Sequence, residues 1–222
     1  MTTCVQSKTS GNLNGNPVTF AYTSNVTQGN LLVVVVGNST TFNVTSISDS
    51  GNGNWNIQVN GIGPDPGSSR NKMTWAWVVA KATGPCTVNV NGSGSFTNMK
   101  VSIAEYNGVN TLRNADAGVT GGGSTIRSGN ITSVAGDLLI MAFTDDNGNS
   151  TTSSYINGLA IRTNFVNSWE ILADNLSSPG GTLQVGMTTS FSVNSGVAGG
   201  SFYYVSPGDI VTLAGEYDGV VQ

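Results

Sequence analysis

The chain has 222 residues, of which 38% are hydrophobic and only 9% are charged, and its formal net charge is −4. The length fits one large β domain, and the aromatic residues argue against a disordered chain. Eight scattered Lys and Arg residues argue against a nucleic-acid partner, which needs a clustered basic surface. No apolar run approaches the ~20 residues of a membrane span, so none is expected.

Short runs of β-branched and aromatic residues recur along the chain, each bounded by Gly, Asn, Asp or Ser. They predict strands at 18–23, 31–36, 44–48, 55–59, 73–81, 86–90, 99–106, 137–144, 154–162, 166–172, 182–193, 201–205 and 210–213. No window sustains the three-and-four spacing of an amphipathic helix. Many short strands separated by turn residues predict an all-β, antiparallel sandwich of jelly-roll type.

Two kinds of strand can be distinguished by their apolar pattern. The strand at 73–79 alternates, which places Met73, Trp75, Trp77 and Val79 on one face. The runs at 31–36 and 138–143 are apolar on both sides, which is typical of central strands covered on both faces.

These two apolar runs are preceded by similar segments. Residues 25–33 and 130–140 share an order of polar, Gly and apolar positions, with two residues inserted in the second copy. We therefore expect two pseudo-repeated halves that share one core, joined around 110–126, in a single domain of residues 1–222. The alternative is two small sandwiches, 1–110 and 127–222.

Segments 29–36, 46–55, 77–90, 104–109 and 136–140 form a recognisable series. In this order they resemble the jelly-roll or Ig-like β-sandwich module found in large secreted or surface proteins of bacteria. The resemblance implies a sandwich with a supporting or adhesive role, which commonly stands beside other Ig-like repeats.

The chain contains no histidine, which removes Ser-His-Asp and Cys-His catalysis and histidine zinc sites together. Among common hydrolytic chemistries this leaves a glycosidase with two carboxyl groups roughly 5–9.5 Å apart. Glu105 and Glu170, both in predicted strands, are the candidate pair. The alternative is that both glutamates sit on solvated faces or bond a neighbouring loop. We expect that the chain is not an enzyme.

Aromatic residues provide candidate ligand-binding positions. Trp75 and Trp77 lie two apart on one strand, a spacing of ~6.6–7 Å that suits stacking along a glycan. Because Met73 and Val79 share that face, a core position is the favoured interpretation of the pair. Tyr203 and Tyr204 are the other candidates, since consecutive strand residues point to opposite faces.

Oxygen-rich loops suggest calcium as the one possible cofactor. Asp145, Asp146, Asn147 and Asn149 supply carboxylate and amide oxygens of the kind that Ca²⁺ takes, although ordinary turn chemistry also explains them.

Cys4 and Cys86 are the two cysteines. A disulfide between them would close a loop of about 80 residues and stabilise the fold by roughly 4 kcal/mol. Two free, buried thiols are the alternative.

Composition and resemblance together predict a non-catalytic, extracellular binding or adhesion module, with polysaccharide or another surface ligand as its partner. The alternative is a structural subunit of a phage particle or surface filament, which predicts self-assembly. Low charge favours both, because neutral polar faces pack without costly charge desolvation. The expected location is extracellular, or a cell or virion surface.

Overall fold

The computed structural model describes residues 1–206, except 39, 64–71, 146–151 and 165–169. The described residues form no helix, so none that could span a membrane is found among them. The strands pair antiparallel throughout the described sheets. The prediction of an all-β, antiparallel sandwich is confirmed.

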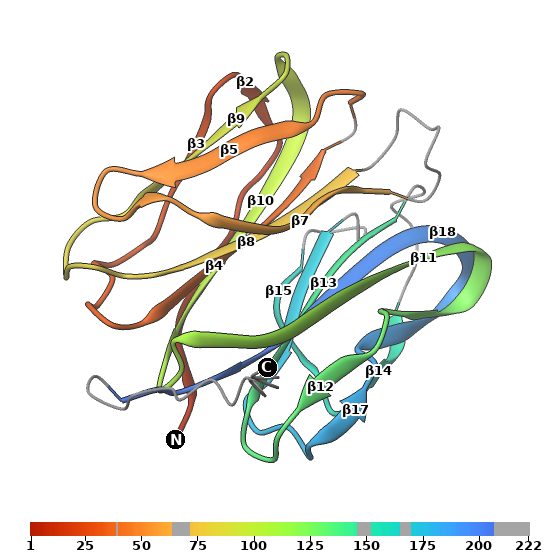
Figure 1. Cartoon of the computed structure of the whole chain (residues 1–222). Helices are drawn as coiled ribbons and strands as arrows, with labels where there is room; N and C mark the ends of the chain where they lie inside the picture. Colours follow the sequence, from red (N-terminus) through yellow and green to blue (C-terminus); the bar gives the residue numbers. More distant parts are fainter. Residues whose placement is uncertain (39, 64–71, 146–151, 165–169, 207–222) are drawn as a thin grey trace, which may run out of the picture.

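The first half of the chain builds one large and one small sheet, drawn in red to yellow-green in Figure 1. The first large sheet has the order β1 (Thr3–Thr9), β10 (Phe96–Asn107), β4 (Leu31–Asn38), β8 (Lys72–Val79) and β7 (Asn56–Ile62), and β2 (Leu13–Gly15) also pairs with β10. The first small sheet has the order β3 (Val18–Ala21), β9 (Thr87–Gly92), β5 (Val44–Asp49) and β6 (Gly53–Asn54).

The second half repeats this arrangement in green to blue (Figure 1). The second large sheet has the order β11 (Thr111–Arg127), β18 (Gly186–Tyr203), β13 (Leu138–Asp145), β16 (Glu170–Asn175) and β15 (Ala160–Asn164), and β14 (Thr152–Ile156) pairs with β18. The second small sheet consists of β12 (Ile131–Ser133) and β17 (Gly181–Leu183). Strands β1, β10, β4, β8 and β7 therefore correspond in order to β11, β18, β13, β16 and β15.

The turn before each central strand is also repeated in its hydrogen bonds. Before β4, Asn30 N donates to Thr27 O at 3.1 Å, and Gly29 N donates to Ala80 O at 2.8 Å. Before β13, Asp137 N donates to Val134 O at 3.0 Å, and Gly136 N donates to Ser178 O at 2.9 Å. Both glycines have positive φ, +86° and +93°, which an L side chain rarely adopts. The similarity between 25–33 and 130–140 thus reflects the same local structure.

The two central strands each lie between two hydrophobic cores. Alternate side chains of β4 enter the core shared with the first small sheet (Leu32, Val34, Val36) and the core between the large sheets (Leu31, Val33, Val35). Strand β13 likewise divides its side chains between the middle core (Leu138, Ile140, Ala142) and the core of the second half (Leu139, Met141, Phe143). All twelve are fully buried, so the prediction of central strands covered on both faces is confirmed.

The two large sheets pack face to face about a pseudo-two-fold axis. Strand β1 lies against β15, and β7 lies against β11. In the same way β10 contacts β16, and β8 contacts β18. Because β1 is equivalent to β11 and β15 to β7, the contact of β1 with β15 is repeated as the contact of β11 with β7. The contact of β10 with β16 is repeated in the same way as that of β18 with β8.

Strand boundaries differ from the prediction mainly in the second half. The halves are joined by Gly108, Val109 and Asn110, whereas the rest of the expected joint at 110–126, from Thr111 onward, lies within β11. The single strand predicted at 154–162 divides into β14 and β15 at a turn where Asn157 and Gly158 have positive φ. The strand predicted at 182–193 is divided between β17, which ends at Leu183, and β18, which begins at Gly186. The strand predicted at 201–205 forms the end of β18 as far as Tyr203, and the one at 210–213 lies outside the described residues.

Candidate functional site

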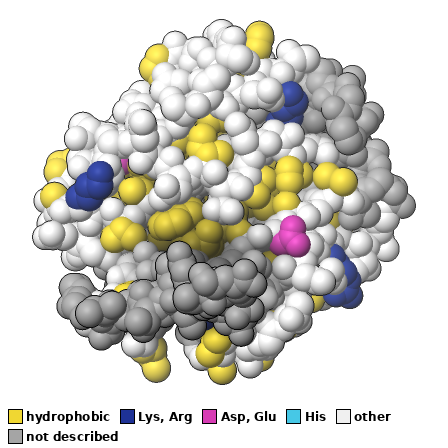
Figure 2. Space-filling model, viewed as in Figure 1, with side chains coloured by type: hydrophobic (Ala, Val, Ile, Leu, Met, Phe, Trp, Pro, Cys, Tyr) yellow, Lys and Arg dark blue, Asp and Glu magenta, His cyan; other side chains and the backbone are white. Residues whose placement is uncertain are grey.

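An apolar seam runs along one side of the molecule where the two large sheets meet. We call it the open seam and define it by Val59 of β7, Trp77 of β8, and Leu112, Ala115, Ala117 and Val119 of β11. The first five are partly buried and pack against the core between the sheets. Val119 follows Ala115 and Ala117 on the same face of β11 and is 53% exposed. Figure 2 shows apolar side chains gathered in a band across the middle of this side.

The two edge strands beside the open seam differ in charge, since β11 contains Arg113, Asp116 and Arg127. In the sheet order, β7 pairs only with β8, and β11 pairs only with β18, so both have one unpaired edge within the described residues. Strand β7, Asn-Ile-Gln-Val-Asn-Gly-Ile, contains no charged residue. Charged side chains are a common protection of exposed sheet edges, and β7 lacks them.

Of the two tryptophans considered as a glycan platform, Trp77 belongs to the open seam and Trp75 lies in the core behind it. Trp75 is fully buried and Trp77 is half-buried. Both meet Phe202 of the other half edge-on, with ring centroids 6.2 and 5.5 Å away. Edge-to-face pairs of this kind stabilise beyond simple burial. The geometry favours the core interpretation, in which the two indoles join the halves.

The opposite seam, between β1 and β15, is polar. Asp174 of β16 is 1% exposed, and its Oδ2 accepts hydrogen bonds from Tyr106 Oη at 2.8 Å and Arg162 Nε at 2.6 Å. Burial and the Asp174 charge raise the pKa of Tyr106 well above its usual value, so the hydroxyl remains a donor. Ser7 Oγ also donates to Arg162 O at 3.3 Å across this seam. We call this side the polar seam.

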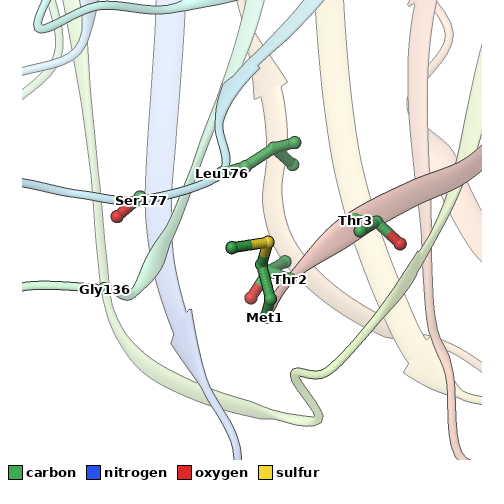
Figure 3. A pocket seen from close by; sticks show the side chains of 6 residues that line it. All are labelled: Met1, Thr2, Thr3, Gly136, Leu176 and Ser177. Carbon is green, nitrogen blue, oxygen red and sulfur yellow. The ribbon is translucent and has the colours of Figure 1, made fainter.

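The described cavity lies where the N-terminal residues meet the second half (Figure 3). It has a volume of about 440 Å³ and is lined by Met1, Thr2, Thr3, Gly136, Leu176 and Ser177. Its lining is mainly apolar and contains no ionisable side chain.

The predicted ligand-binding tyrosines lie at the end of β18. Tyr204 is 56% exposed, whereas Tyr203 is half-buried, with the Arg113 guanidinium 4.3 Å from its ring centroid. Arg113 is held by Asp137 through Nε at 2.7 Å, and this hydrogen bond raises the pKa of Arg113. Tyr204 is therefore available to solvent, while Tyr203 is engaged within the molecule.

Glu105 is bound on several sides. It is fully buried, and its carboxylate accepts from Thr27 N at 2.8 Å, Asn30 Nδ2 at 2.7 Å and Gln6 Nε2 at 2.6 Å. It lies opposite Leu32 on the face of the first large sheet that is turned toward the first small sheet.

Glu170, the other predicted glutamate, begins β16 in the second large sheet and pairs through its backbone with Thr144, and its side chain lies outside the described part. Glu105 thus points away from the sheet that carries Glu170.

The predicted calcium ligands fall largely outside the described residues. Asp145 ends β13 and pairs through its backbone with Ser195, but Asp146, Asn147 and Asn149 are not described. Among the residues that are described, no cluster of His, Cys, Asp or Glu could hold a metal ion. The calcium site stays a prediction.

The disulfide prediction is wrong, because Cys4 and Cys86 are both free. Cys86 is buried in the core shared with the first small sheet, whereas Cys4 packs against the core between the large sheets. The first large sheet separates the two thiols, so they cannot meet. Burial raises the pKa of Cys86 to about 12.

No family model and no curated protein matches this chain. Among solved structures it has a similarity to the crystal structure of PBSX exported protein XepA, with 9% identity over 91% of this chain and 86% of that chain. The TM-score is 0.21, so the similarity carries no argument about fold or function. The resemblance to the bacterial surface module is supported only at the level of an all-β sandwich.

Sequence reasoning missed the Tyr106–Asp174–Arg162 cluster. One local signal was present: Asp174 follows Ile171, Leu172 and Ala173 in an apolar run. Carboxylates are almost never fully buried unless they are paired, so an acid in such a run predicts a partner. The identity of the partner could not be read from the sequence, because Tyr106 lies 68 residues away.

Proposed function

We propose that this chain is a non-catalytic structural protein that pairs with a second copy of itself through the open seam. The open seam is the observation that carries the proposal: a half-exposed, uncharged strip that continues the core between the two large sheets. A second copy suits this strip because an identical apolar strip would be removed from water at the same time. The surface or virion setting expected from composition belongs to the same proposal.

The hydrogen bonds of the buried carboxylates support the proposal that the protein is non-catalytic. Four carboxylates are buried among the described residues, and each accepts hydrogen bonds from nearby groups. They are Asp49, Glu105, Asp137 and Asp174. A catalytic pair needs carboxyl groups free to exchange protons with a substrate. Groups engaged in this way serve the fold better than a reaction.

Sedimentation velocity over a range of concentrations tests the proposal. The parent chain is expected at about twice 22.8 kDa, and Val119→Lys at 22.8 kDa, because a charge in the strip would have to be desolvated on pairing. The matched control is Val5→Lys, an exposed valine (48%) on the edge strand of the polar seam, which should pair like the parent. A parent chain that stays monomeric at its highest soluble concentration would refute self-pairing.

Polysaccharide binding is a second candidate, favoured by the exposure of Tyr204 beside the guanidinium-stacked Tyr203. A ring with one open face can stack on a sugar. Pull-down with insoluble polysaccharides should retain the parent and lose Tyr204→Ala, while Val5→Lys remains bound. Equal retention of Tyr204→Ala and the parent would exclude this site.

A further inference from the structure

The interface between the halves presents the same strand positions twice. Leu31 and Leu138 begin the equivalent strands β4 and β13 and pair with Tyr106 and Phe202, respectively. Two residues further, Val33 pairs with Trp77, and Ile140 pairs with Asp174. Phe202 is therefore the counterpart of Tyr106, and Asp174 is the counterpart of Trp77.

These counterparts meet each other across the pseudo-two-fold axis. On the open-seam side, Trp77 of the first half contacts Phe202 of the second, with centroids 5.5 Å apart. On the polar-seam side, the same two positions hold Asp174 and Tyr106, joined by a 2.8 Å hydrogen bond. One structural contact thus occurs twice, once as an aromatic pair and once as a carboxylate with a hydroxyl donor.

This difference decides which halves fit together. Two first halves packed in the same geometry would place Trp77 against Tyr106 on both sides. Two second halves would place Asp174 against Phe202 on both sides, which buries a carboxylate against a ring that cannot donate to it. Arg162 lies in the same half as Asp174 and would accompany it in either pairing. Tyr106 is consequently the group that distinguishes the correct partner.

We propose that the hydrogen bond between Tyr106 and Asp174 is a specificity element that restricts this surface to pairing a first half with a second half. The partner concerned is another copy of the chain, whose equivalent surface is exposed whenever the halves have not yet docked. Without both the carboxylate and the Tyr106 hydroxyl, the two kinds of half carry only apolar groups at these positions, and like halves of different copies become acceptable partners.

Refolding at rising protein concentration tests this specificity. All chains carry Val119→Lys, so that pairing through the open seam does not contribute, whether or not that proposal holds. The double variant Tyr106→Phe/Asp174→Leu replaces both partners of the hydrogen bond by apolar groups of similar size, a change that can be nearly neutral. Arg162 loses its ion-pair partner in this variant, but its side chain is 26% exposed and reaches solvent. We expect the reference chain to refold to monomer, and the double variant to give a dimer fraction that rises with concentration, at least severalfold above the reference.

Two further chains make the result decisive. Trp77→Phe keeps the other contact aromatic and should refold to monomer, which controls for general disturbance of the interface. Tyr106→Phe alone removes only the distinguishing donor and should give an intermediate dimer fraction. If the double variant does not fold, this single variant decides. Dimer fractions equal to the reference at every concentration would overturn the proposal.

Discussion

Replacement of Glu105 by Gln is expected to destabilise the fold without touching an exposed surface. The carboxylate takes three hydrogen bonds, from Thr27 N, Asn30 Nδ2 and Gln6 Nε2, and none of its surface is exposed. The amide of Gln keeps one acceptor but turns an NH₂ group toward a donor. One hydrogen bond to a charged group contributes about 1.5–3 kcal/mol, so the loss of one with weakening of the others predicts about 2–4 kcal/mol.

Urea and thermal unfolding measure this effect. For a chain of this size each kcal/mol shifts Tm by about 2–4 °C, so the midpoint should fall by roughly 5–15 °C. The matched control is Asp116→Asn, which removes an exposed carboxylate whose bond is to the adjacent Ala117 N, and which should change stability by less than about 0.5 kcal/mol. An unchanged midpoint for Glu105→Gln, together with loss of a glycan-hydrolysing activity, would refute the structural role and restore the glycosidase hypothesis.

Three more outcomes follow from the interface and the cores. Trp75→Ala should cost about 3–5 kcal/mol in urea unfolding, because a fully buried indole is lost from between the halves, and a cost below about 1 kcal/mol would contradict its core position. Gly200→Ala should cost about 1–3 kcal/mol, since its Cβ would lie 2.3 Å from Trp75 Cη2, and full stability would show that the indole can move aside. Burial raises the pKa of Cys86 from 9.0 to about 12, so the folded state keeps a proton that the unfolded state releases. The free energy of unfolding should therefore fall as the pH rises from 9 to 12, and it should fall less in Cys86→Ala. Equal alkaline unfolding profiles for parent and variant would contradict the shift.

The sequence predicted best those strands whose own apolar pattern determines which of their faces are buried. Residues 31–36 and 138–143 are apolar at consecutive positions, and only burial on both faces accommodates that pattern. The core position of Trp75 followed from its apolar neighbours on one face in the same way.

Strand β11 could not be predicted for the opposite reason. Its sequence includes Gly121–Gly122–Gly123, which locally indicates a turn, and its pairing partner β18 is also rich in small residues. The strand is specified by its ladder with β18 and by close packing: a Cβ added at Gly118 would lie 2.5 Å from Arg127 O. The ladder depends on a segment distant in the sequence, as does the Tyr106–Asp174 pair.

The contrast between the two seams predicts how large an assembly can become. A pseudo-two-fold axis would give two alike seams if the halves were identical, and copies could then add on both sides without limit. Here one seam is apolar, whereas the other is occupied by Arg162, Asp174 and Tyr106. A single self-complementary strip is satisfied by one partner and closes a two-fold dimer. The mass in sedimentation should therefore stop at about twice 22.8 kDa as concentration rises. Continued growth beyond that mass would show that the polar seam also accepts a partner.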